Sequence, residues 1–167
     1  MPYTPNYAAG DVLTAAAMNS IGEAWTTYTP TWSVFNGTTS IGNGSITGSY
    51  VVLNKLVFGR IKLTWGSTTS TSGAGANNPF LFSPAPGYDI NSGFATRTPI
   101  GTALVEDSGT TFFLGVALAN SATTISVQVP QYNSGISLLY SDYLAKGLPF
   151  TFGDTDAVTL TYCYQRA

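Results

Sequence analysis

Histidine is absent from this chain of 167 residues, and cysteine occurs once. Without histidine the chain lacks the commonest general base and the commonest transition-metal ligand, and a Ser-His-Asp or Cys-His catalytic arrangement is excluded. A single cysteine, Cys163, excludes an internal disulfide. Because Cys163 lies in an alternating run beside threonines, we expect an inert thiol rather than a nucleophile.

Charged residues are also scarce, at 8% of the chain, against about 25% in typical soluble proteins. Ser and Thr supply the polarity instead, at about a quarter of the residues. The formal net charge of −2 gives weak repulsion between copies, so the composition indicates a chain that lives in an assembly. Nucleic acid is not an expected partner, because the few basic residues form no phosphate-binding stripe. They are Lys55, Arg60, Lys62, Arg97, Lys146 and Arg166.

Long apolar runs are missing as well. The longest one, FFLGVALA from Phe112, has about eight residues, less than half of what spans a bilayer. The first residues lack the basic flank and the continuous apolar stretch of a secretory signal. We therefore expect a protein made in the cytoplasm, with no membrane insertion and no cofactor.

A short amphipathic helix is predicted before Trp25. Asp11 or Thr14 can cap its start, and Met18, Ile21 and Trp25 fall at i, i+3 and i+7, on one side of the helix. At roughly a dozen residues such a helix would be marginal alone in water. Its apolar side must therefore pack on its own domain, on other copies of the chain, or on another protein.

Residues 25–32, WTTYTPTW, connect the predicted helix with the rest of the chain. Pro30 forces the preceding residue out of the α region. Trp25, Tyr28 and Trp32 could clamp the helix onto the following domain or onto a neighbouring subunit, and purely intramolecular packing is the alternative. We accordingly predict an N-terminal anchoring segment over residues 1–32 and a β domain over residues 33–167.

The β domain is predicted from alternation with a period of two. Between Val57 and Trp65 the residues at odd positions are apolar or Gly, while Arg60 and Lys62 occupy the opposite, water-facing side. The run from Ile46 to Leu53 precedes this strand and is joined to it by Asn54 and Lys55, a candidate tight turn because Asn tolerates positive φ.

Three further runs read as strands. Two of them alternate apolar and polar residues, and in the third, from Phe112 to Ala119, large residues on one face and small ones on the other favour a strand covered on both sides. Because no crossover helices are available, we predict an all-β protein, an antiparallel β-sandwich or jelly roll with a short N-terminal helix. Long loops are expected over residues 67–78 and 84–98. The two alternating runs have Ile125, Val127, Val129 and Val158, Leu160, Tyr162, Tyr164 on their apolar faces.

Acidic residues offer two candidate pairs for acid-base or metal chemistry, Glu106 with Asp107 and Asp154 with Asp156. Glycosidases use paired carboxylates in this way. Both pairs lie among Ser, Gly and Thr, where Asp side chains usually bond to their own backbone, so we expect turns. Asp154 and Asp156 lack the further oxygen ligands of a calcium loop. We predict no catalytic and no metal site.

A tyrosine-bearing segment is the remaining candidate for ligand binding. Tyr132, Tyr140, Asp142 and Tyr143 combine aromatic rings with a carboxylate, the combination by which sugar-binding surfaces stack and hydrogen-bond their ligands. Tyrosines at a subunit interface are the alternative interpretation.

Five stretches of the chain, taken in order, carry a resemblance to a known family. They are GDVLTAAAMN (10–19), WTTYTPTW (25–32), GNGSITGSYVVLNKLVFGRIKLTWGSTT (42–69), GTALVEDS (101–108) and PFTFGDTDAVTLTYCYQ (149–165). Together they resemble virion proteins of tailed bacteriophages that infect actinobacteria, described as minor tail proteins, head fibres or capsid decoration proteins. The likeness covers nearly the whole chain. One departure is that a histidine often occurs in the family pattern where this chain has Phe58 and Gly59.

The resemblance implies a trimeric β domain carried on the virion by a short N-terminal element. We therefore expect a structural, non-enzymatic protein, made in the cytoplasm of the host bacterium, with other copies and capsid or tail proteins as partners. A receptor-binding or carbohydrate-binding tail module that contacts host-surface glycans is the second hypothesis, and a histidine-free glycan hydrolase is the third. The residues expected to anchor the chain are Val12, Leu13, Met18, Ile21, Trp25, Tyr28 and Trp32.

Overall fold

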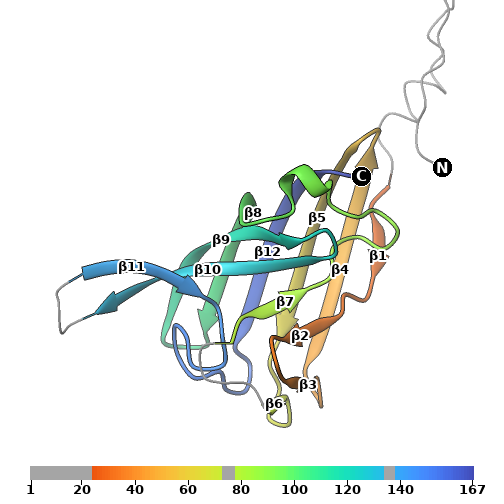
Figure 1. Cartoon of the computed structure of the whole chain (residues 1–167). Helices are drawn as coiled ribbons and strands as arrows, with labels where there is room; N and C mark the ends of the chain where they lie inside the picture. The colour runs from red at the N-terminus through yellow and green to blue at the C-terminus, as the bar shows by residue number, and fades with distance from the viewer. Residues whose placement is uncertain (1–23, 73–77, 134–137) are drawn as a thin grey trace, which may run out of the picture.

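The computed structural model describes residues 24–72, 78–133 and 138–167, and these form an antiparallel all-β structure (Figure 1). The expectation of an all-β, antiparallel protein is confirmed. The predicted N-terminal helix lies outside the described residues. The strands are β1 Thr26–Tyr28, β2 Trp32–Val34, β3 Thr38–Ser40, β4 Ser45–Leu53, β5 Leu56–Thr64, β6 Ser70–Ser72, β7 Phe80–Phe82, β8 Thr98–Asp107, β9 Thr111–Ser121, β10 Thr124–Asn133, β11 Leu138–Tyr143 and β12 Ala157–Gln165.

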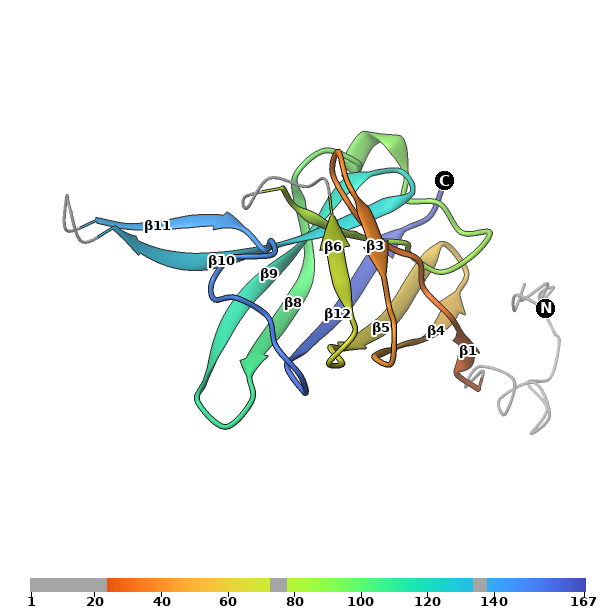
Figure 2. The same cartoon turned by 90° about the horizontal axis from the view of Figure 1, so that it is seen from below.

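Ten of the strands form one sheet with the order β1-β4-β5-β12-β8-β9-β10-β7-β2, and β11 pairs with β10 outside this path. The sheet is curled, so that the β4, β5, β12 and β8 side lies across the core from the β10, β7 and β2 side (Figure 1). The end of β10 and β11 project from the body as a two-stranded ribbon. Strands β3 and β6 form a separate pair, seen side by side in Figure 2.

The curl follows from a short connection. β1 and β2 lie at opposite ends of the strand order, yet only residues 29–31 separate them in the chain. The two ends of the sheet therefore come together. The Tyr28 hydroxyl of β1 reaches this meeting point and donates to the carbonyl oxygen of Ser83, just after β7, over 3.3 Å. The two hydrogen bonds between Thr31 and Ser83, over 3.0 and 2.9 Å, extend the β2–β7 ladder.

The main sheet begins earlier than the sequence predicted. The expected boundary after residue 32 falls inside β2, and both β1 and β2 belong to the β domain. Strands of three residues are too short to show alternation, which is why the Thr-rich segment around Pro30 resembled a linker.

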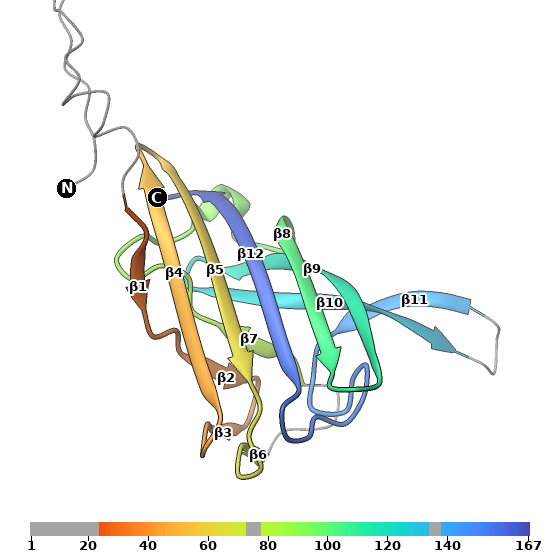
Figure 3. The ribbon, with the colours of Figure 1, turned by 180° about the vertical axis from the view of Figure 1, so that it is seen from behind.

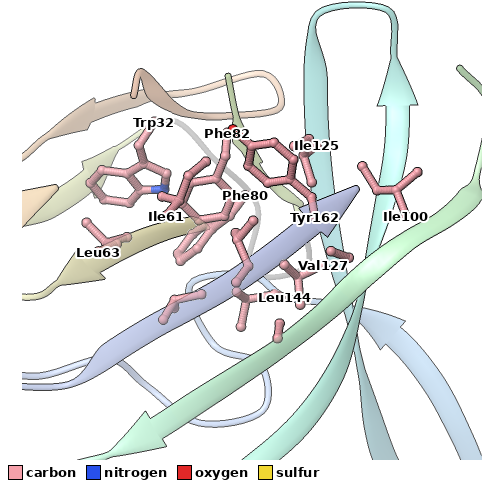
Figure 4. Close-up of a cluster of buried hydrophobic side chains, with 14 of the residues drawn as sticks. Trp32, Ile61, Leu63, Phe80, Phe82, Ile100, Ile125, Val127, Leu144 and Tyr162 are labelled. Atoms are coloured by element: carbon pink, nitrogen blue, oxygen red, sulfur yellow. The ribbon is translucent and has the colours of Figure 1, made fainter. Parts of the chain in front are cut away.

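The core lies between the two sides of the curled sheet (Figure 4). Trp32 is 8% exposed and meets the ring of Trp65 edge-on, with ring centroids 5.1 Å apart. Phe80 and Phe152 complete this aromatic group. The predicted inward faces of three strands are confirmed as buried. They comprise Val57, Ile61 and Leu63 of β5, Ile125, Val127 and Val129 of β10, and Val158, Leu160, Tyr162 and Tyr164 of β12.

The predicted turn between β4 and β5 is also confirmed. The two strands pair along their whole length, and Asn54 in the turn has a φ of 55°. This hairpin and β12, which pairs with β5 from Ala157 to Gln165, form the longest continuous ladders of the sheet.

Tyrosine hydroxyls provide the polar part of the core. The hydroxyls of Tyr28 and Tyr162 lie 3.0 Å apart, and Tyr28 also donates to the Ser83 carbonyl oxygen over 3.3 Å. Burial raises the pKa of Tyr28 from 10.0 to about 12, and it raises the pKa of Tyr162 well above its ordinary value. Both hydroxyls therefore stay protonated in the folded protein at pH values where an exposed tyrosine would begin to ionise.

Glycine makes room for these rings. A Cβ built on Gly59 would lie 2.1 Å from Cζ of Tyr162, and one built on Gly48 would lie 2.4 Å from Cε1 of Tyr28. Both tyrosine rings therefore rest directly on the backbone of neighbouring strands.

Gly59→Ala is expected to destabilise the protein by about 1–3 kcal/mol, because the added methyl group displaces the buried Tyr162 ring. Chemical denaturation measures the free energy of unfolding. Gly153→Ala is the matched control, since its Cβ would meet no atom closer than 3.7 Å. Equal effects of the two substitutions would contradict the described packing of Tyr162.

The stability of the fold is expected to fall as the pH rises from about 10 to about 12. An unfolded tyrosine ionises near pH 10, whereas the raised pKa of Tyr28 keeps it protonated when folded, so its contribution is complete below pH 10 and is lost above it. Tyr28→Phe should reduce this slope, and Tyr140→Phe, on the exposed part of β11, should leave it unchanged. Denaturation at several pH values tests this, and equal slopes for all three proteins would refute it.

Candidate interaction surface

The outward side of β4, β5, β12, β8 and β9 forms a broad surface, which we call the outer face (Figure 3). Strand pairing fixes which residues lie side by side on it. One row runs from Lys62 through Thr159 and Leu104 to Leu114, and the next row runs from Arg60 to Val116. Threonine occupies the β12 position in both rows. The charged and the large apolar side chains of the outer face therefore lie on its two flanks.

Large apolar side chains are exposed on the β8–β9 flank. Phe112 is 67% exposed, Leu114 69%, Val116 41% and Leu104 39%. Leu104 and Leu114 are direct partners in the ladder, and the other two follow on the same side of β9. We call these four residues the apolar strip. Contiguous apolar surface of this kind is typical of interaction sites.

The apolar strip corrects one sequence prediction. The run from Phe112 to Ala119 was expected to be covered on both sides, but its outward residues Phe112, Leu114 and Val116 remain open to solvent in the described structure. The inward side is covered as expected, with Ala117 and Ala119 fully buried. Sequence alone could not separate the faces, because both are apolar, and only the curl of the sheet determines which one receives the core.

Acidic residues lie at one end of the apolar strip. Glu106 pairs with Phe112 across the β8–β9 ladder, and Asp107 follows at the start of the turn. A shallow depression at this end is lined by Leu104, Glu106, Asp107 and Phe112. We call Glu106 and Asp107 the acidic end of the strip.

The opposite flank of the outer face is basic. Arg60 and Lys62 project outward from β5 and line a shallow depression with Thr47 and Thr159. Arg60 Nε donates to the hydroxyl oxygen of the buried Ser49 over 2.9 Å, so its stem is held against the sheet. We call Arg60 and Lys62 the basic flank.

Trp25 lies next to the basic flank. Its ring is 50% exposed, and the Arg60 guanidinium lies over it at 5.4 Å from the ring centroid. A second depression, which is almost wholly apolar, is lined by Trp25, Val51, Leu53 and Phe58. We call these four residues the apolar corner. Each flank of the outer face therefore combines charge of one sign with apolar side chains.

The residues predicted to anchor the chain are separated by the structure. Val12, Leu13, Met18 and Ile21 lie outside the described residues. Trp25 is exposed on the outer face. Trp32 is buried in the domain, and Tyr28 is partly buried against the core with its hydroxyl bonded to Tyr162, as the intramolecular alternative expects.

The residues considered for sugar binding do not share one surface. Tyr140 and Asp142 lie on one side of β11 and Tyr143 on the other, because side chains alternate along a strand. Asp142 Oδ1 accepts from the Tyr143 N–H over 2.7 Å, and Arg97 lies over the Tyr143 ring. The side chain of Tyr132 lies outside the described residues.

The second carboxylate pair is structural. Asp156 is buried and accepts from the Ser108 N–H over 2.8 Å and from the Gly153 N–H over 2.6 Å, which confirms its predicted role in a turn. Asp154 is exposed beside it.

Within the described residues, no three acidic, cysteine or histidine side chains are grouped as a metal site would need. Nor does any helix in that part of the chain have the length and apolar character to cross a membrane.

Comparison of the chain with protein-family models, with curated proteins and with solved structures gave no match. The outer face is therefore interpreted from its own residues.

Proposed function

We propose that this protein is a structural component of a tailed-bacteriophage virion, a trimeric head fibre, capsid decoration protein or minor tail protein, and that it acts by adhesion rather than by catalysis. The apolar strip is the single observation that carries this proposal. The resemblance of the sequence to such virion proteins is the reason for proposing a tailed-bacteriophage virion as the particle.

The exposed strip favours an assembled state on energetic grounds. Each square ångström of apolar surface removed from water contributes about 25 cal/mol, and two of the strip's side chains, Phe112 and Leu114, are about two-thirds exposed. With 8% charged residues, the chain has little electrostatic repulsion to oppose association. Partners of this protein are therefore other copies and capsid or tail proteins.

The N-terminal segment is proposed to attach the domain to the particle. Residues 1–23 precede the sheet, and Met18 and Ile21 fall on the same side of the predicted helix as Trp25. Trp25 is exposed where this segment joins the domain. A helix with one apolar side can bind a groove on a capsid or tail protein.

The glycan-binding alternative has less support, because Tyr143 lies on the other side of β11 from Tyr140 and Asp142. No observation on the outer face favours it, and it is not carried further.

Two measurements test the proposal. Mass spectrometry of purified virions should detect the full-length chain at a fixed copy number.

A chain that lacks residues 1–23 should remain folded, but its occupancy on particles should fall by at least about tenfold, if the apolar side of the segment provides most of the binding energy. Met18→Ser with Ile21→Ser should cause a similar loss, whereas Thr4→Ser with Ser20→Thr should cause none.

Absence of the full-length chain from purified virions would refute the proposed function. Normal occupancy of the truncated chain would refute the anchoring role alone. Circular dichroism of each variant confirms that the β domain is folded in the comparison.

A further inference from the structure

We infer that the outer face binds a second copy of this chain, with the β8–β9 flank of one copy against the β4–β5 flank of the other. The inference rests on the proposed function, because it specifies how copies of an assembled protein contact one another. It concerns the apolar strip and acidic end on one flank, and the basic flank and apolar corner on the other.

Charge complementarity supports a second copy as the occupant. The β8–β9 flank carries Glu106 and Asp107, and the β4–β5 flank carries Arg60 and Lys62. These opposite charges lie on one face of one chain, so two copies can match them without a different partner. Complementary charges of this kind set the register and the rate of association.

Within one chain, β12 lies between the opposite charges. Lys62 lies in the row of Leu104, and Glu106 lies one row further along β8. With strands about 4.8 Å apart and two residues spanning about 7 Å, β12 keeps the two Cα positions about 12 Å apart. At that distance, on an exposed surface, the attraction is largely screened by salt.

In a closed ring of copies, the β8–β9 flank of each chain would meet the β4–β5 flank of the next. If the ring axis runs parallel to the strands, the rows of neighbouring copies stay level, so Lys62 of one copy faces the row of Leu104, one row from Glu106 of the next. The contact therefore places the acidic end of one copy beside the basic flank of another.

The apolar strip would be covered in the same arrangement. Leu114 lies in the row of Lys62 and Val116 in the row of Arg60, one row before Phe58. With the rows level, the strip of one copy therefore covers the aliphatic stems of Lys62 and Arg60 of the next copy, and Val116 lies beside its apolar corner. Burying the strip removes the largest exposed apolar group of the outer face from water.

The deciding experiment is a charge exchange on the full-length chain. Sedimentation velocity over a dilution series gives the dissociation constant of self-association. Lys62→Glu and Glu106→Lys, each alone, should raise this constant by about tenfold, because each brings like charges together. The double variant with both substitutions should restore association to near the wild-type value, since the charges are again opposite.

Controls with the same change in net charge are available. Lys146→Glu and Asp89→Lys alter exposed residues outside the outer-face strands and should leave the dissociation constant unchanged. Leu114→Ser should weaken association by about tenfold or more, because it removes a central apolar side chain. Phe94→Ser, which removes a 48% exposed ring outside the strip, should have little effect.

Recovery in the double variant supports the inference, since no partner other than a second copy would be restored by it. A monomeric wild-type chain at all concentrations would overturn it, as would unchanged association of the single variants or a double variant as weak as the singles. If residues 1–23 of the same chain cover the strip instead, the full chain would stay monomeric while a chain without residues 1–23 would associate, and that result also overturns the inference. Because this measurement uses no virions, it can fail while the proposed function stands.

Discussion

The three-residue connection between β1 and β2 is the constraint on which the rest of the structure depends. It joins the two ends of a ten-stranded sheet, and the sheet can satisfy it only by curling until β1 comes near β7, where the Tyr28 hydroxyl donates to the Ser83 carbonyl oxygen. Curling gives the sheet an inside and an outside. The inside receives the aromatic core around Trp32 and the tyrosine pair Tyr28 and Tyr162, and the outside of β4, β5, β12, β8 and β9 remains open.

A uniformly polar outer face would be an ordinary water-exposed surface. The centre of the outer face is polar in this way, since Thr102, Thr159 and Thr161 lie on the middle strands β8 and β12. The flanks differ, because exposed Phe112 and Leu114 on one side and Trp25 beside Arg60 on the other are costly to leave in water. In a chain with so few charges, we attribute these side chains to contacts that the isolated domain does not make.

Much of the sheet could be predicted from the sequence, because long strands with one buried face show clear alternation. The β4–β5 hairpin, with Asn54 at positive φ, and the inward residues of β10 and β12 were identified in this way. The short strands β1 and β2 could not be identified, since three residues carry no periodic signal. Their place in the sheet depends on pairing with β4 and β7, which are distant in sequence.

The interaction surface was largely hidden from sequence analysis for a different reason. The run around Leu114 has apolar residues on both faces, and no local pattern says which face a distant strand will cover. Trp32 is the reverse case, because the sequence left open whether this aromatic contacts a partner or its own domain, and it is buried against Trp65. Burial at both places is decided by the curl of the whole sheet.

Hydroxyl-radical footprinting of the Phe112 and Leu114 side chains tests the central claim most directly, namely that assembly covers the outer face. It reports side-chain exposure, whereas amide exchange would be slow in both states because the strands are already hydrogen-bonded. The account predicts that oxidation of Phe112 and Leu114 falls severalfold between a dilute and an assembled sample, while oxidation of Phe94 stays the same. Equal oxidation of Phe112 and Leu114 in an assembled sample would contradict it.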